Sequence, residues 1–368
     1  MGTRSLKPKQ ELGDLVRRRY QSVGLTGWPG EDAASVVRRL GAMQSQDYGP
    51  AKWSIGQRTG ADNDTLDRQF NHGQFLRTHV LRPTWHFVHP ADLRWLLELT
   101  RDRVHMINGF MYRQESLDRL LRDRADAVLI DALRGGRSLT RSELADALKD
   151  TNIVAERFRL AYLLMSAELD GIVCSGPRRG TEHTYSLVEE RVPAVRSLTR
   201  DEALAELTFR YFSSHGPATV KDFGWWSSLT QTEIKRGLQL VGARLSKEQI
   251  DDVAFWSSDE ALSTRAAGPR VDLLQGYDEY IVGYSQSKYL LDVAGRTKTA
   301  RRVPFNGAVL VDGQVRGQWK RTVTKATVAV EAVLNESFDK KGLAALEQEV
   351  NRHGQFLGRP ATLEVAVL

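Results

Sequence analysis

The chain has 368 residues, of which 41% are hydrophobic and 27% are charged. This length exceeds one ordinary compact core and this balance excludes a disordered chain, so we expect about two to four folded units. The formal net charge of +6 and the sequence pI of about 9.4 are compatible with a polyanionic partner but do not by themselves indicate one.

Cysteine usage and hydropathy limit the compartment of the protein. The single cysteine, Cys174, excludes an intrachain disulfide and a thiolate zinc cluster, which favours a reducing compartment. Residues 1–9 are polar and lack the apolar core of a signal peptide. No uncharged apolar run approaches the roughly 18 residues that a membrane helix needs. We therefore expect a cytoplasmic protein that does not contact a membrane.

The first part of the chain has the element order of a winged helix. A basic helix is expected around residues 12–20, and apolar residues at helical spacing predict an amphipathic helix over 31–43. Gly and Pro within 44–50 are expected to end that helix. Residues 74–88 indicate two short strands, and a further helix is expected from Pro90.

The same order of helices followed by a strand pair recurs twice. The second unit is expected to comprise a capped helix over 138–148, a longer helix over 155–169, and two strands within 171–188. Either Ser138 or Thr140 caps its first helix, with Glu143 three residues beyond Thr140. The third unit is expected to comprise helices over 201–213, 220–226 and 229–241 and a weaker strand pair at 255–258 and 261–264.

The pattern changes to β-rich from about residue 272. Strands are expected in the apolar stretches 280–284, 308–311 and 327–330, and the pair Asp312-Gly313 predicts a hairpin. A helix over 339–352 and a strand over 361–367 close the chain. The expected division is 1–115, 116–195, 196–268 and 269–368, which gives an α+β fold of three tandem winged-helix units and a C-terminal β-rich domain.

Common catalytic motifs are missing from the sequence. It contains no HExxH, Walker loop, GxSxG or GxGxxG with a suitable acidic residue, and its eight histidines lack metal-ligand spacing. We therefore expect neither a metal nor a cofactor.

The run Gln44-Ser45-Gln46 is the strongest chemical candidate in the chain. Residues two apart point to the same side of an extended chain, so both amides can face one cavity. A carboxamide can donate to and accept from the same water, and two of them can position a nucleophile. The alternative interpretation is that these are surface or capping glutamines.

Four passages together resemble the AlkZ/YcaQ superfamily of bacterial DNA glycosylases, and the resemblance covers nearly the whole chain. They are LGAMQSQD (40–47), LRPTWHFV (81–88), LLQGYDEY (273–280), and VLVDG (309–313) with WKR (319–321). The resemblance implies that three winged helices and a barrel-like C-terminal domain form a C-shaped, basic DNA channel with a Gln-x-Gln motif at its centre. Ser45 departs from the usual aliphatic residue of that motif, and Pro83 and Trp85 depart from the Arg-Gly-Thr-Leu-His of relatives.

The activity implied by the resemblance is excision of N7-alkylated purines from double-stranded DNA, including bulky adducts and the unhooking of interstrand crosslinks. Gln46 is expected to orient the water and Gln44 to fix the sugar or the same water, with Asp47 as a less favoured base. No lysine stands in a Schiff-base position, so a monofunctional enzyme without a lyase step is expected. The lesion is expected to stay stacked, because bulky adducts do not fit a tight pocket.

A set of mostly basic residues is expected to contact DNA. Arg178, Arg179, Lys320 and Arg321 are expected at hairpin tips, where a solvated role is the alternative, and the basic run 296–302 is either a phosphate grip or an exposed loop. The full set is Arg82, Trp85, His86, Arg178, Arg179, Arg296, Lys298, Arg301, Arg302, Lys320 and Arg321.

The remaining expectations concern assembly and biological role. We expect a nucleoid-associated monomer that serves either self-resistance to a DNA-alkylating natural product or general repair. The alternative functions are a non-catalytic winged-helix DNA-binding regulator and a protein-interaction scaffold.

Overall fold

The computed structural model describes residues 7–28, 31–258, 269–296 and 307–368. Within these ranges, no helix combines the length and the apolar character needed to cross a membrane. The expected sites Lys298, Arg301 and Arg302 and the expected strand at 261–264 lie outside the described residues.

The first unit has the order helix, strand, helix, helix, strand, strand. Its elements are α2 (Ala33–Leu40), β1 (Met43–Gln44), α3 (Tyr48–Thr59), α4 (Asn63–Asn71), β2 (Leu76–Val80) and β3 (Arg82–Val88), preceded by α1 (Lys7–Ser22) and followed by α5 (Pro90–Gln114). The strands form an antiparallel sheet in the order β1-β3-β2. Leu81 makes the tight turn between β2 and β3 with a φ of 64°.

The second unit repeats this order. It comprises α6 (Arg119–Leu133), β4 (Leu139–Thr140), α7 (Arg141–Asp150), α8 (Arg157–Leu169), β5 (Val173–Ser175) and β6 (Thr184–Leu187), and the short α9 (Val188–Arg191) follows. Its sheet has the matching order β4-β6-β5. A capping box starts α7, in which Thr140 accepts from the N–H of Glu143 and Glu143 accepts from the N–H of Thr140.

The third unit is a variation on the same order. It comprises α10 (Arg200–Ser214), α11 (Val220–Ser227), α12 (Gln231–Val241), the 3₁₀ turn η1 (Gly242–Arg244), β7 (Ser246–Ile250) and β8 (Val253–Ser257). An isolated bridge between Ala218 and Trp256 stands where the other units have their first strand. Helices followed by a strand pair are thus confirmed in all three units.

The C-terminal part is a sheet with one helix packed on it. It comprises β9 (Val271–Leu274), α13 (Glu279–Val282), the 3₁₀ turn η2 (Lys288–Asp292), β10 (Gly307–Val311), β11 (Gln314–Val323), β12 (Val328–Leu334), α14 (Lys340–Phe356) and β13 (Ala361–Val367). The strand order is β13-β12-β11-β10-β9, with β12 and β13 parallel and the other pairs antiparallel. The predicted hairpin is confirmed, because Asp312 and Gly313 both have the positive φ of a type I′ turn.

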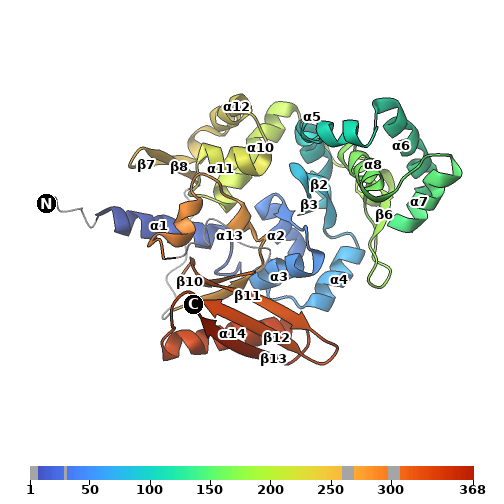
Figure 1. The fold of residues 1–368 in the computed structure, drawn as a ribbon. Coiled ribbons are helices and arrows are strands. Elements are labelled where there is room, and N and C mark those ends of the chain that lie inside the picture. The colour runs from blue at the N-terminus through green and yellow to red at the C-terminus, as the bar shows by residue number, and fades with distance from the viewer. Residues whose placement is uncertain (1–6, 29–30, 259–268, 297–306) are drawn as a thin grey trace.

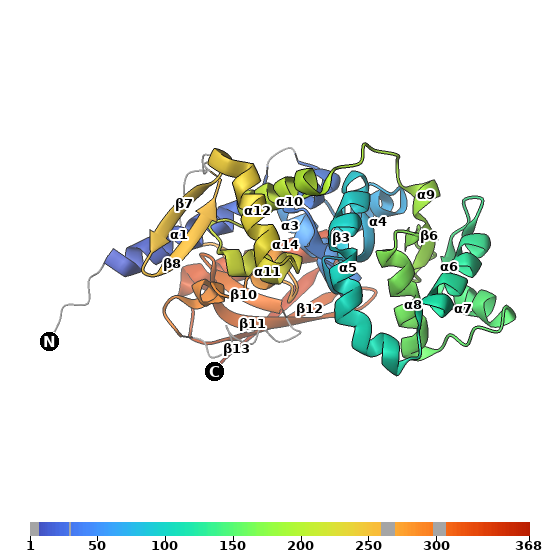
Figure 2. The ribbon, with the colours of Figure 1, turned by 90° about the horizontal axis from the view of Figure 1, so that it is seen from above.

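The first unit lies at the centre of the molecule. Figure 1 shows the second unit to its right, the third unit above and to its left, and the C-terminal sheet below; the view from above in Figure 2 agrees. One apolar core joins the first and third units, and another joins the first unit to the C-terminal sheet and α14. The second unit has a core of its own, formed by residues between Tyr112 and Leu187.

Several local expectations are wrong, each for an identifiable reason. The helix expected over 31–43 ends at Leu40, because Gly41 takes a φ of 79°, and Met43 and Gln44 form a strand instead. Gly49 and Pro50 therefore do not end this helix; they lie in the first turn of the next one, α3, where the missing N–H of Pro50 costs nothing. The stretch 280–284 is not a strand; Asp278 accepts from the N–H of Tyr280 and caps α13.

Two expectations for β structure also need correction. The described strands of the C-terminal sheet form an open sheet instead of a barrel-like closure, because α14 and α3 cover its apolar face. In the third unit, β8 pairs with β7, a polar strand that precedes it in the chain and that apolar patterning did not detect.

Candidate active site

The sheet of the first unit holds the Gln-x-Gln run in an extended conformation. Gln44 pairs with His86 across β1 and β3, and the N–H of Ser45 continues the pairing by donating to the carbonyl of Trp85 at 2.7 Å. Alternation along an extended chain then sends Gln44 and Gln46 to one side and Ser45 to the other. The Ser45 side chain is fully buried.

Both glutamine side chains are held by β3 through their carbonyl oxygens. Oε1 of Gln44 accepts from Nη2 of Arg82 at 3.2 Å, and Oε1 of Gln46 accepts from the backbone N–H of Trp85 at 3.3 Å. Gln44 is buried and Gln46 is exposed. No group of the described residues accepts a hydrogen bond from the NH₂ of either amide, so these donors remain available to a substrate or to water.

A buried carboxylate lies directly behind Gln44. Glu279, at the start of α13, accepts from the N–H of Gln44 at 2.6 Å, from Nε1 of Trp226 at 2.8 Å, and bonds Nε2 of His215 at 3.3 Å. Burial acts to raise the pKa of Glu279, but the bond and charge of His215, the charge of Arg82 and the N–H of Gln44 outweigh it and hold the pKa at about 2. Glu279 is therefore a permanent negative charge beneath the motif.

Arg82 and His86 form the layer between this carboxylate and the surface. Nη2 of Arg82 also lies 3.3 Å from Nε2 of His86, whose Nδ1 bonds the carbonyl of Thr84 at 2.9 Å. Burial and the charge of Arg82 lower the pKa of His86 to about 3, so the ring is neutral near pH 7. His86 is fully buried, which places it in the support of the site and away from the surface expected for a DNA contact.

Arg77 of β2 is a part of the site that the sequence analysis missed. Its Nε and Nη2 donate to the carbonyls of Ser45 and Gln46 at 3.0 and 3.2 Å, and its guanidinium lies 4.3 Å from the ring centre of Trp85. The ring of Trp85 also contacts His79 at 4.5 Å. The available signal was three polar residues in a row, Arg77 to His79, inside a strand flanked by apolar residues.

The basic residues of β11 lie within a strand and not at a hairpin tip, because β11 extends to Val323. Nη1 of Arg321 bonds Nε2 of His353 at 2.9 Å, and its Nη2 lies beside Gly49 near the start of α3. Asp47, the N-cap residue of α3, is exposed and makes no side-chain capping bond. Arg321 thus stands near the motif, together with Asp47.

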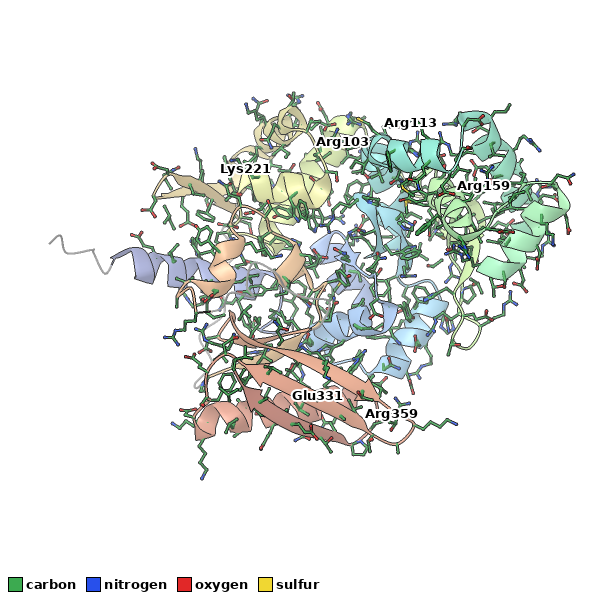
Figure 3. The ribbon with its side chains drawn as sticks, in the orientation of Figure 1. Arg103, Arg113, Arg159, Lys221, Glu331 and Arg359 are labelled. Atoms are coloured by element: carbon green, nitrogen blue, oxygen red, sulfur yellow. The ribbon has the colours of Figure 1, made fainter. Side chains whose placement is uncertain are left out.

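Lys320 points to the opposite side of β11. Its Nζ pairs with Glu331 of β12 at 2.8 Å on the outward face of the sheet, where Figure 3 labels Glu331. The side chain of Lys320 is exposed.

The other predicted DNA contacts also have partners within the protein. Arg178 and Arg179 lie in the loop between β5 and β6, where a hairpin tip was expected. The guanidinium of Arg178 lies 4.7 Å from the ring centre of Tyr48 and 3.6 Å from Asp67. The guanidinium of Arg179 bonds Glu143 of α7. Arg296 pairs with Glu336 at 2.8 Å. Exposed pairs of this kind are weak, so Arg179 and Arg296 can exchange their carboxylates for phosphate at low cost.

Metal-binding geometry is absent from the part of the chain that the structure describes, where no group of three or more His, Cys, Asp or Glu residues could hold an ion.

Comparisons with known proteins identify a family and a related fold. The family model for AlkZ-like DNA glycosylases matches residues 37–356. The solved structure of the Streptomyces sahachiroi DNA glycosylase AlkZ shares the fold with a TM-score of 0.79 at 22% sequence identity, over 97% of this chain and 99% of that chain. No curated protein matches the sequence.

Proposed function

The chain belongs to the AlkZ-like DNA glycosylase family, and from that premise we propose that it hydrolyses the N-glycosidic bond of N7-alkylated purines in duplex DNA. The observation that carries this proposal is the pair of glutamines fixed through their carbonyls to β3, with their NH₂ groups unused by the described residues.

The demands of the reaction match what two amides can supply. Alkylation at N7 gives the purine a positive charge, so breaking the bond from C1′ to N9 returns the electron pair to the ring and releases a neutral base. The oxygen of water bonds to C1′, its proton leaves to solvent, and an abasic site remains. Such a base needs no general acid, so placing water and stabilising an oxocarbenium-like sugar are the main tasks.

The two glutamines take different roles in this proposal. Gln46 is exposed and orients the attacking water, whereas Gln44 is buried against Arg82 and fixes the sugar or the same water. Glu279 supplies negative charge behind Gln44, where positive charge develops on the sugar. Asp47 is a less favoured base, and the enzyme acts without a lyase step.

The proposed DNA-binding surface is formed by all parts of the chain. The three units serve as winged helices of a C-shaped basic channel, with boundaries at 1–115, 116–195, 196–268 and 269–368. In this proposal a monomer in the cytoplasm, associated with the nucleoid, excises simple and bulky adducts and unhooks interstrand crosslinks. It serves either self-resistance to a DNA-alkylating natural product or general repair.

Base release from defined DNA tests the activity. Purified wild type with a duplex carrying N7-methylguanine is expected to release free base and leave an abasic site, measured by mass spectrometry. Gln44→Ala and Gln46→Ala are expected to lower the rate by about tenfold to a thousandfold while DNA affinity is kept. Gln74→Ala, an exposed glutamine of the same unit, is the matched control.

The outcomes separate an enzyme from a regulator. Binding of the duplex without base release by wild type contradicts the proposal and supports a non-catalytic DNA-binding protein. Equal rates for wild type and both motif variants would leave the glycosylase but remove the roles given to the glutamines.

A further inference from the structure

A cavity of about 500 Å³ opens between the first and second units, beside the glutamine motif. The first unit contributes Arg77 and Trp85 from its β2–β3 hairpin. The second unit contributes the start of α7, Leu160 of α8, Glu182 and His183 just before β6, and Tyr185 within β6. The function proposed above does not use this cavity.

The cavity wall is also the support of the motif. Trp85 lines the cavity, and its N–H donates to Oε1 of Gln46. Arg77 also lines the cavity and donates to the carbonyls of Ser45 and Gln46. A group in the cavity therefore contacts Trp85, the residue that holds the side-chain amide of Gln46, which we propose orients the attacking water.

The wall offers hydrogen bonds that the protein does not use. Within the described residues, no hydrogen bond is made by Nε1 of Trp85, by the hydroxyl of Tyr185 or by either ring nitrogen of His183. Burial and the charges of Arg77 and Arg178 lower the pKa of His183 to about 4, so its ring is neutral near pH 7. Aromatic surface with neutral donors suits a planar group that carries oxygen acceptors.

The charges around the cavity select against a cation. Neither Arg77 nor Arg141 has a carboxylate within 4.0 Å among the described residues. Arg141 donates only to the carbonyl of Arg157, at 2.9 Å. Glu182 is the single carboxylate on the wall, and it is exposed. A neutral or anionic occupant is therefore favoured.

The size of the cavity and the position of N7 both suit a bulky substituent. N7 of a purine faces the major groove, so its substituent projects away from the base stack. A methyl group fills only a small part of a cavity whose volume is within the usual range for drug-sized ligands. Resting on the proposed function, we propose that this cavity binds the substituent of a bulky N7 adduct, namely a planar, oxygen-bearing aromatic group without positive charge.

Filling the cavity while leaving the motif unchanged tests the proposal. Ser142 lines the cavity at the exposed second position of α7, and its hydroxyl contacts that of Thr140 at 3.0 Å. Ser142→Tyr fills the space, whereas Ser142→Ala loses the same hydroxyl contact and keeps the space open. Glu182→Tyr, with Glu182→Gln as control, is the second pair if Ser142→Tyr does not fold.

Two substrates are compared in one duplex sequence, one with N7-methylguanine and one with guanine alkylated at N7 by aflatoxin B1 epoxide, whose substituent is planar and oxygen-rich. Ser142→Tyr is expected to lower excision of the aflatoxin adduct by roughly tenfold or more relative to Ser142→Ala. Excision of N7-methylguanine is expected to be the same for both variants.

Each other outcome contradicts the proposal in a distinct way. If Ser142→Tyr lowers excision of both substrates equally relative to Ser142→Ala, the cavity receives the purine itself. If it lowers excision of neither substrate, the cavity is not used. Wild type that excises N7-methylguanine but not the aflatoxin adduct would contradict the cavity assignment alone. Wild type that releases neither base would contradict the proposed function as well.

Discussion

The backbone N–H of Gln44 donates to Oε1 of Glu279 at 2.6 Å, which joins two residues that are 235 positions apart in the sequence. The first unit presents the amides, and the start of the C-terminal part supplies the charge behind them. The candidate site is therefore assembled only when both parts are folded together.

Replacement of Glu279 tests this relationship. Glu279→Gln keeps the shape but leaves Arg82 without its buried counter-charge, so we expect a loss of stability of about 3–5 kcal/mol. At a temperature where the variant is folded, base release is expected to fall at least roughly tenfold with little change in DNA affinity. Glu331→Gln, on the outward face of the sheet, is the control; equal rates for the two variants would exclude an electrostatic role.

Trp53 tests the shared core of the first unit and the C-terminal sheet. Its side chain is 1% exposed, its Nε1 donates to the carbonyl of Leu273 at 2.7 Å, and its ring lies 5.1 Å from that of Phe356. Trp53→Ala is expected to lower the free energy of unfolding by about 3–5 kcal/mol. It is also expected to lower the protection of amides from hydrogen exchange in the first unit and in the C-terminal part together.

The second unit is expected to respond separately, because it has its own core. Leu129→Ala removes a fully buried side chain of α6 and is expected to lower exchange protection in that unit alone. A uniform loss of protection over the whole chain in both variants would contradict this division.

Glu349 predicts a pH dependence of stability. Burial raises its pKa from 4.5 to about 7, against the opposing charge of Arg352 and the bond from Gln57. A carboxyl with a raised folded-state pKa contributes stability that is complete below the unfolded pKa of 4.5 and is lost as the pH rises through about 7.

The measurement is urea unfolding of wild type and Glu349→Gln across the pH range. The variant imitates the protonated acid, so its stability is not lost with rising pH. Its free energy of unfolding relative to wild type is therefore expected to rise by up to roughly 3 kcal/mol between about pH 5 and about pH 8. A constant difference between the two proteins would show that Glu349 titrates normally.

Salt dependence tests the proposed DNA contact of the second unit. Arg179 is half exposed, and its guanidinium contacts Glu143 and the carbonyl of Ser138 at the surface. Such exposed contacts are weak, so the side chain can turn to a phosphate. Arg179→Ala is expected to reduce the slope of log affinity against log salt by about 1. Arg119→Ala, which breaks a similar surface pair with Asp123 in the same unit, should leave the slope unchanged.

Local signals predicted much of the fold. The helix cap expected at Ser138 or Thr140, the hairpin at Asp312-Gly313 and the strand Ala361–Val367 depend on a few neighbouring residues. The structure confirms the hairpin and the strand and shows that Thr140 is the cap. The apolar stretch 280–284 could not be assigned in this way, because its helix is selected by the cap at Asp278 and by burial against distant segments.

The site was predicted less completely than the fold. Extended geometry at the glutamine run followed from its position after a helix, although the strand pairing with β3 did not. Glu279 and Arg77 reach the motif across 235 and about 30 positions, and no spacing rule in a single sequence connects residues over such separations. Their roles become visible only when the contacts are known.

The alternation at residues 44–46 places two different demands on one short motif: the middle residue has to fit the interior, and the flanking glutamines face the site. Ser45 points into the interior, and its hydroxyl has no hydrogen-bond partner among the described residues, so an aliphatic side chain suits the position at least as well. A change at this middle residue is therefore expected to alter how the interior is filled, whereas a change at either flanking glutamine is expected to alter the proposed chemistry.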